Sequence, residues 1–277
     1  MFDLPIDRPA LMGILNVTPD SFSENGVNFL EDDAVSAGLR MLDEGADLLD
    51  IGGESTRPGA EPVSNDEELR RVIPVVERLV RAGAKISVDT RRAGVAKQAL
   101  DAGAHVINDV SGLSEPEMLE VCAAGQAAIC VMHMQGAPQT MQAKPSYVDV
   151  EHEVLSYLLG QAEMATRMGI ARDQVWIDPG IGFGKTPVHN LALLHGLDKF
   201  VATGFPVLIG VSRKSSIGLY AGGASVDRRL PGTLAAQVLA QAAGVRVVRA
   251  HDVWEARQAI DVAAAILKPS SFSRHPA

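Results

Sequence analysis

Short apolar runs alternate with longer amphipathic runs along most of this 277-residue chain. The apolar runs are rich in Val, Ile and Leu and are nearly continuous, which is typical of parallel strands that are buried on both faces. We expect eight such strands, at Leu11–Leu15, Leu48–Ile51, Ile86–Val88, His105–Ile107, Ala128–Met132, Val175–Ile177, Val207–Ile209 and Arg246–Val248. The amphipathic runs between them are the expected helices.

Glycine follows most of these amphipathic runs. A glycine just after the last apolar position is the preferred left-handed cap of a helix. The pattern predicts helices over Asp32–Glu44, Asp66–Ala82, Arg92–Ala102, Glu115–Ala124, Val150–Met168 and Leu230–Ala243, capped by Gly45, Gly83, Gly103, Gly125, Gly169 and Gly244. A last helix is expected over Asp252–Leu267.

Eight strand–helix units in a chain of this length favour an α/β fold, namely a single (β/α)8 TIM barrel of parallel strands with outer helices. A doubly wound sheet is the alternative. The sequence has no composition break and no linker rich in Pro or Ser, so we expect one domain over residues 1–277. Its core would span residues 10–267, followed by a polar tail over 268–277.

Composition limits the partners and the compartment. The net charge of −9 argues against nucleic acid, which needs a basic face, but leaves room for a small anionic ligand. No apolar run approaches the roughly 18 residues of a membrane span. The start, MFDLPIDRP, lacks a signal-peptide pattern, so we expect a cytoplasmic protein. Cys122 and Cys130 lack zinc-site spacing and are expected in the core of a protein kept in a reducing compartment.

Polar and charged residues follow every expected strand. In barrels of this type, the carboxyl ends of the strands carry the chemistry. Some of these side chains suit phosphate oxygens, namely Arg57, Lys214, Arg249 and His251. Others are short acceptors and amides that could bind the edge of a flat heterocycle, namely Asp89, Asn108 and Asp178. The combination predicts a heterocyclic ligand that carries phosphate.

Several other features allow two interpretations. Gly180–Thr186 resembles a phosphate-binding loop, but Pro179 stands where that motif needs its first glycine. Asp109 and Asp252 are either helix N-caps or site residues, and His133 is either a hydrogen-bonded core residue or a catalyst. Two long polar loops, 18–30 and 53–65, are expected to be functional, since long loops in compact domains often act as lids.

Eight segments of the chain form a recognisable series: GILNVTPDSF (Gly13–Phe22), GGESTRPG (Gly52–Gly59), SVDT (Ser87–Thr90), INDVSG (Ile107–Gly112), VMHMQG (Val131–Gly136), DPGIGFGK (Asp178–Lys185), GVSRKS (Gly210–Ser215) and RAHD (Arg249–Asp252). In this order they closely resemble the dihydropteroate synthase family of pterin-binding barrels. The resemblance implies a barrel, usually homodimeric, that condenses 6-hydroxymethyl-7,8-dihydropterin diphosphate with 4-aminobenzoate. The products would be 7,8-dihydropteroate and diphosphate, in folate biosynthesis.

The resemblance also implies roles for individual residues. Pterin binding falls to Asp89, Asn108, Met132, Asp178 and Lys214. Diphosphate binding falls to Asn16, Arg57, Arg249 and His251, with Asn16 as a ligand of a Mg²⁺ cofactor. The aminobenzoate site, where sulfonamides also bind, would be lined by Thr56, Pro58, Phe183, Lys214 and Ser215. The catalytic set is Asp89, Arg57, Lys214, Arg249 and His251. In the first loop the chain departs from the family, because Glu24-Asn25-Gly26 replaces the usual Asp-Gly-Gly.

Three alternative functions make different demands on the sequence. A catalytically silent pterin-binding paralogue should have lost anchors such as Asn16, Arg57 or Arg249, and all are present. A pterin-dependent methyltransferase barrel should lack NVTPDSF, SRKS and RAHD, which this chain has. A phosphosugar barrel would not explain Asp89, Asn108 and Asp178 together. The expected reaction is dissociative: the bond to diphosphate breaks largely before the amine attacks.

Overall fold

The computed structural model describes residues 2–18, 27–55 and 59–269. Its strands are β1 (Ala10–Asn16), β2 (Leu48–Gly52), β3 (Ile86–Asp89), β4 (Val106–Asp109), β5 (Ala128–Met132), β6 (Val175–Asp178), β7 (Leu208–Gly210) and β8 (Val247–Ala250). The helices are α1 (Val27–Asp43), α2 (Asn65–Arg81), α3 (Ala93–Asp101), α4 (Glu117–Ala124), α5 (Val150–Arg167), α6 (Pro187–His195), α7 (Leu197–Val201), α8 (Ser215–Tyr220), α9 (Leu230–Ala242) and α10 (Val253–Leu267), with 3-10 turns η2 (Arg172–Gln174) and η3 (Val226–Arg228).

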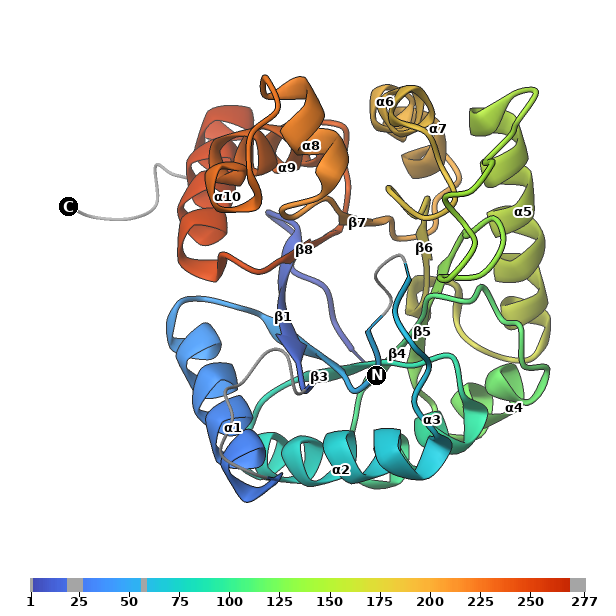
Figure 1. The fold of residues 1–277 in the computed structure, drawn as a ribbon, viewed down its shortest axis with the longest axis vertical. Coiled ribbons are helices and arrows are strands. Elements are labelled where there is room, and N and C mark those ends of the chain that lie inside the picture. The colour runs from blue at the N-terminus through green and yellow to red at the C-terminus, as the bar shows by residue number, and fades with distance from the viewer. Residues whose placement is uncertain (1, 19–26, 56–58, 270–277) are drawn as a thin grey trace.

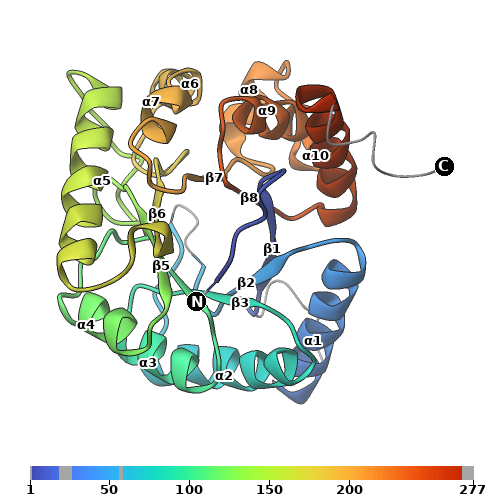
Figure 2. The same ribbon diagram turned by 180° about the vertical axis from the view of Figure 1, so that it is seen from behind.

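The eight strands form one parallel sheet in the order β6-β5-β4-β3-β2-β1-β8-β7. Its two edges meet through a bridge between Ile177 and Val207, where Ile177 N donates to Pro206 O at 2.9 Å. The sheet is therefore a nearly closed barrel, and the helices surround it on all sides (Figures 1 and 2). The predicted (β/α)8 barrel is confirmed, and the doubly wound alternative is wrong.

The predicted strands and helices are found, most of them with small shifts of their ends. The exception is α1, which begins at Val27, five residues before its predicted start at Asp32 and inside the predicted loop 18–30. Five of the six predicted glycine caps have the left-handed backbone, with φ between 87° and 102°. Gly125 does not: its φ is −79°, and the next residue, Gln126, takes φ +50° instead. The last α4 bond comes from Gly125 N to Val121 O, so the chain turns one residue later than predicted.

Three helices that the sequence analysis did not anticipate follow β6 and β7, namely α6, α7 and α8. A capping signal for α6 is present in the sequence. Thr186 accepts a hydrogen bond from His189 N at 3.2 Å, and Pro187 occupies the first turn. A threonine followed by proline is a standard helix start, so α6 could have been predicted from these two residues.

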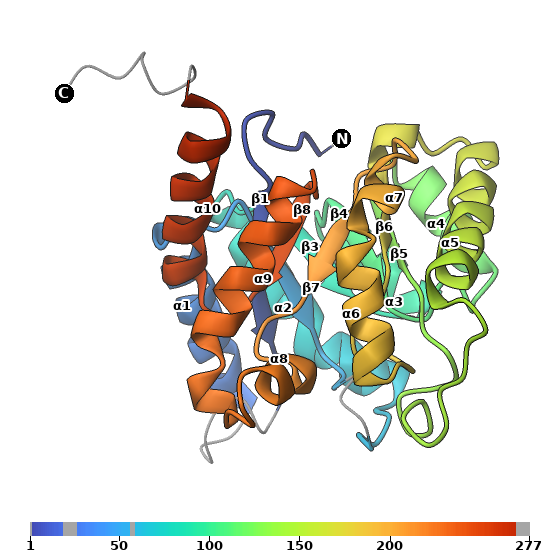
Figure 3. The same ribbon diagram turned by 90° about the horizontal axis from the view of Figure 1, so that it is seen from above.

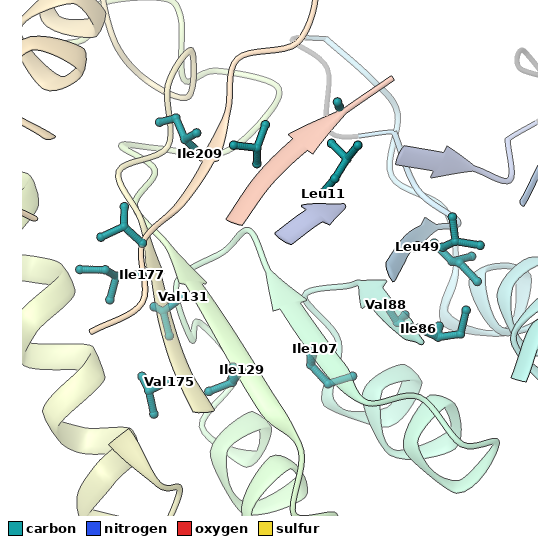
Figure 4. Close-up of a cluster of buried hydrophobic side chains, with 14 of the residues drawn as sticks. Leu11, Leu49, Ile86, Val88, Ile107, Ile129, Val131, Val175, Ile177 and Ile209 are labelled. Atoms are coloured by element: carbon teal, nitrogen blue, oxygen red, sulfur yellow. The ribbon is translucent and has the colours of Figure 1, made fainter. Parts of the chain in front are cut away.

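Side chains on the strands alternate between the two faces of the barrel wall, as the two-residue period of a strand requires. The outward set packs against the helices, as Figure 4 shows for Leu11, Leu49, Ile107, Val131 and Ile177. An inward set forms a second apolar cluster around the fully buried Trp176, contributed by Ala10, Met12, Leu48, Val106, Ala128, Cys130, Leu208 and Val247. Both cysteines are buried and unpaired, as expected for core residues.

The N-terminal segment contributes to the inward cluster. Phe2 packs edge-on against Trp176, with ring centroids 5.7 Å apart. Gln174 fixes the Phe2 backbone through two hydrogen bonds of 3.0 Å, from Phe2 N to Gln174 Oε1 and from Gln174 Nε2 to Phe2 O. In Figure 3 this segment lies at one end of the barrel and α8 lies at the other. Within the described ranges, no helix has the length and apolarity needed to cross a membrane.

Replacing Phe2 by alanine should therefore destabilise the barrel. Phe2 is only 4% exposed, whereas Ile6 of the same segment is 91% exposed. We expect Phe2→Ala to lower the free energy of unfolding by about 3 kcal/mol, and Ile6→Ala to change it by less than about 0.5 kcal/mol. Urea unfolding followed by circular dichroism measures both. Equal stability of the two variants would show that the packing of Phe2 does not stabilise the barrel.

Candidate functional site

The inward face of the barrel changes from apolar to polar along the strands. Residues two positions after the inward apolar cluster are polar or charged on most strands, for example Asp50 after Leu48 and Asp178 after Trp176. The pairing register places Asp50 opposite Ser87, Asp89 opposite Asn108, Met132 opposite Asp178 and Gly210 opposite Arg249. The residues that the sequence predicted at separate strand ends thus share one end of the barrel interior.

Arg249 on β8 reaches past β1 to side chains on β2 and β3. Its Nε donates to Asp50 Oδ2 at 2.6 Å, and its Nη2 donates to Asp89 Oδ2 at 3.0 Å. The side chain of Asp50 is fully buried and that of Asp89 is 9% exposed, while that of Arg249 remains 20% exposed. One guanidinium therefore binds two carboxylates and still has surface that faces the open end of the barrel.

Asp50 is a central residue of this network that the sequence analysis missed. Besides Arg249, it accepts hydrogen bonds from Ser87 Oγ at 2.6 Å and from Asn108 Nδ2 at 3.0 Å. The signal was an acidic residue inside the apolar run Leu48–Ile51, two positions after an inward leucine. A carboxylate placed there by the two-residue period must face the barrel interior, where it needs partners.

Burial sets the pKa values of the two predicted pterin-binding carboxylates. It raises the pKa of Asp89 to about 8, with Arg249 opposing the rise and Asp50 adding to it. Burial also raises the pKa of Asp178. The charge of Lys214 opposes this rise, and so does the hydrogen bond of 2.7 Å that Gly180 N donates to the carboxylate. Both carboxyl groups would be stabilised in their charged form by a ligand that presents N–H donors.

Lys214 extends from the end of β7 toward the loop after β6. Its Nζ donates to the Ile181 carbonyl and lies 4.5 Å from the centre of the Phe183 ring. Burial lowers the pKa of Lys214 to about 8, with Asp178 opposing this fall. The next residue, Ser215, is exposed and begins α8. The structure thus brings together three residues that the resemblance assigns to the aminobenzoate site.

His251 and Asn16 border the same end of the barrel. Ser212 orients His251, because its Oγ lies 3.1 Å from the His251 backbone N and 3.0 Å from the ring Nδ1. Asn16 is the last residue of β1 and pairs with Gly52, whose missing Cβ would lie 3.8 Å from Asn16 Oδ1. The Asn16 amide oxygen therefore lies beside the end of β2, where Gly52 presents no side chain.

The Asn16 amide oxygen fits one ligand position of Mg²⁺, which prefers oxygen donors and keeps water and phosphate oxygens in its shell. Among the residues that the structure describes, no group of three or more Asp, Glu, His or Cys side chains could hold a metal ion. A Mg²⁺ ion at Asn16 would therefore depend on oxygens of a bound diphosphate.

A cavity of about 140 Å³ opens beside Asp89, lined by Glu54, Ser55, Thr90, Met134 and other residues of the second, third and fifth strand ends. The predicted site residues Thr56, Arg57 and Pro58 lie outside the described residues. So do residues 19–26 of the first loop, which include the departure from the family at Glu24-Asn25.

Asp109 and Asp252, which the sequence left as either helix N-caps or site residues, have structural roles. Asp109 shapes the turn after β4, because its carboxylate accepts from Ser111 N and Oγ and from Leu113 N at 2.6–3.0 Å. It is not a helix N-cap. Asp252 precedes α10 but makes no capping hydrogen bond; its carboxylate binds Arg213 instead, with Nε 2.9 Å away.

Lys185 is the second residue that the sequence analysis missed. It ends the glycine-rich stretch that resembles a phosphate-binding loop, but its side chain is 2% exposed and turns into the protein. Its Nζ lies 3.0 Å from Nδ1 of His133, which is itself buried. His133 is thus a hydrogen-bonded core residue. The inward direction of Lys185 agrees with the incomplete phosphate-binding motif in residues 180–186.

Known proteins are similar to this chain over the whole barrel. Residues 12–251 match the model of the family described as pterin binding enzyme. Dihydropteroate synthase of Escherichia coli K12 is 46% identical over 273 residues, which are 98% of this chain and 96% of that protein.

Two solved structures of Xanthomonas albilineans dihydropteroate synthase superpose closely. One, with 4-aminobenzoic acid, has a TM-score of 0.88 at 44% identity and covers 98% of this chain and 95% of that one. The other, in complex with 7,8-dihydropteroate, has a TM-score of 0.85 at 41% identity and covers 99% and 97%. With the strand-end residues in place on the same barrel, the chain belongs to the dihydropteroate synthases, within the family of pterin-binding enzymes.

Proposed function

We propose that this chain condenses 6-hydroxymethyl-7,8-dihydropterin diphosphate with 4-aminobenzoate, giving 7,8-dihydropteroate and diphosphate. The observation that carries the proposal is the meeting of Asp89, Asp178, Lys214 and Arg249 at one end of the barrel interior. The Xanthomonas albilineans relative has been solved with 4-aminobenzoic acid and with 7,8-dihydropteroate, which are one substrate and the product of the proposed reaction, and this supports the proposal.

The pterin would occupy the polar end of the inward face. Asp178 and Asn108 would accept from and donate to the 2-aminopyrimidine edge, while Asp89 would face the ring that becomes cationic. Lys214 would donate to the carbonyl and ring-nitrogen side. Met132, which pairs with Asp178 and is 2% exposed, would pack against the flat face of the ring.

Positive and polar groups around the barrel mouth would bind the diphosphate. Arg249 has the exposed surface to reach it, and Ser212 already orients the His251 ring. Arg57 would add a second guanidinium. Asn16 would hold Mg²⁺, which when bound neutralises charge on the leaving diphosphate.

The reaction would begin with cleavage of the bond between the exocyclic methylene and the diphosphate oxygen, with the electron pair leaving on diphosphate. Asp89 would stabilise the resulting pterin cation through charge. The aminobenzoate nitrogen would then form the C–N bond and lose its proton to water. An arylamine attacks without prior deprotonation, so no strong base is needed. Phe183 and Ser215, with Thr56 and Pro58, would line the aminobenzoate site, where sulfonamides would compete.

Release of diphosphate in the presence of Mg²⁺ tests this function. We expect release only when both substrates are present, and a fall of at least about 100-fold in kcat/KM for Asp89→Asn and for Arg249→Ala. The control is Arg167→Ala, at an exposed arginine of α5. Release that does not depend on aminobenzoate would contradict the proposal, and no release from the folded wild type would indicate the silent paralogue.

We further propose that the chain forms a homodimer through an apolar face on α6, α8, η3 and α9. Helices α6, α8 and α9 lie on one side of the barrel (Figure 1), and η3 contacts α8. The exposed side chains of this face are Val188, Leu191, Leu219, Tyr220, Val226 and Leu239. A groove of about 410 Å³ between α6, α8 and α9 continues the face. Exposed apolar surface of this kind marks an interface in a protein that remains in solution.

Sedimentation equilibrium measures the mass of the particle directly. We expect twice the 29.3 kDa of one chain for the wild type. Leu239→Glu should give single chains, because it places a charge on the apolar face beside its groove, whereas Val148→Glu, at an exposed residue outside that face, should remain dimeric. A monomeric wild type, or a dimeric Leu239→Glu variant, would refute this interface.

A further inference from the structure

Lys185 is a buried lysine to which the proposed reaction gives no role. Its Nζ lies within hydrogen-bonding distance of three atoms: His133 Nδ1 at 3.0 Å, His133 O at 3.2 Å and Phe183 O at 3.0 Å. Two of these atoms belong to the residue that follows β5, and the third belongs to the loop that follows β6. The ammonium group therefore joins the ends of two adjacent strands.

The loop from Gly180 to Thr186 fits tightly against the chain that follows β5. Gly180, Gly182 and Gly184 all have positive φ, at 67°, 85° and 62°. A Cβ atom on Gly180 would collide with the His133 carbonyl, and one on Gly184 would collide with the backbone of Gln135. The two segments meet backbone to backbone, and Lys185 is the side chain that reaches between them.

This loop carries two groups on which Lys214 depends. The Ile181 carbonyl accepts a hydrogen bond from Lys214 Nζ, and the Phe183 ring lies 4.5 Å from the same atom. The backbone carbonyl of the same Phe183 accepts a hydrogen bond from Lys185 Nζ. Displacement of the Phe183 backbone would therefore move both the Phe183 ring and the nearby Ile181 carbonyl that accepts from Lys214.

We propose that Lys185 is a positioning residue: its hydrogen bonds to His133 and Phe183 fix the loop that places the Phe183 ring and the Lys214 ammonium group for the two substrates. The inference rests on the proposed function, because it assigns Phe183 and Lys214 to aminobenzoate and pterin. Lys185 itself would touch neither substrate.

The chemistry around Lys185 favours a role in geometry over one in stability. No carboxylate forms a salt bridge with Lys185 among the described residues, and burial lowers the pKa of its amine to about 7. Lys214 adds to this fall and Asp178 opposes it. Burial and the nearby Lys185 lower the pKa of His133 to about 3, so its ring is neutral and can accept a hydrogen bond at Nδ1. An apolar side chain would be cheaper to bury here, but could not join the two segments.

The first experiment compares Lys185→Met with Lys97→Met, a control at an exposed lysine of α3. We expect Lys185→Met to raise the KM for aminobenzoate about tenfold or more, because more than one hydrogen bond is lost. Its kcat should fall by a smaller factor, and the control should stay within about twofold of the wild type. A folded Lys185→Met variant with unchanged KM would overturn the inference.

A double-mutant cycle with Phe183→Leu shows whether Lys185 acts through that ring. Once Phe183 is shortened, Lys185→Met should add much less to the KM for aminobenzoate than it does alone. Fully additive effects would contradict a positioning role through Phe183. The inference and the proposed function can fail separately, because diphosphate release by the wild type tests the function alone.

A second pair of variants keeps the inference testable if Lys185→Met does not fold. Asparagine at position 133 keeps a hydrogen-bond acceptor at the δ position, whereas alanine removes it. His133→Asn should hold the KM for aminobenzoate within about threefold of the wild type, and His133→Ala should raise it by about three- to tenfold. Equal values for the two variants would overturn the inference.

Discussion

The buried ion pairs of Arg249 with Asp50 and Asp89 organise the rest of the site. A guanidinium and two carboxylates removed from water are costly unless their geometry satisfies all of them. Here Ser87 and Asn108 complete the hydrogen bonds of Asp50, and the second carboxylate takes the other end of the guanidinium. Strands β2, β3, β4 and β8 each contribute to this network, so the closed barrel is what makes it possible.

The inward face of the barrel is apolar at one end of the strands and polar at the other. At one end, the inward side chains form the apolar cluster around Trp176, which Phe2 joins from the N-terminal segment. Two residues further along the same strands, the inward positions hold the network of charges and amides. The apolar end provides burial. At the polar end, burial raises the pKa values of Asp89 and Asp178, and a ligand with N–H donors would stabilise their charged forms.

Much of the fold and part of the site could be predicted from the sequence. Apolar runs and glycine caps located the strands and most helices, and residues at strand ends, such as Asp89 and Arg249, do meet in space. Asp50 and Lys185 were missed because one lies inside a strand and the other inside a glycine-rich loop. Their roles depend on partners distant in sequence, 199 residues away for Asp50 and 52 for Lys185. Gly125 was misassigned because either of two adjacent residues can end α4.

The proposed function requires Asp50 to hold Arg249 and Asn108 in place for the pterin diphosphate. Calorimetric binding of dihydropterin diphosphate, with Mg²⁺ present, to Asp50→Asn tests it most directly, once circular dichroism has shown that the variant is folded. We expect binding weaker by about 10- to 100-fold, since a charge-assisted hydrogen bond contributes about 1.5–3 kcal/mol. A folded variant that binds as tightly as the wild type would contradict it.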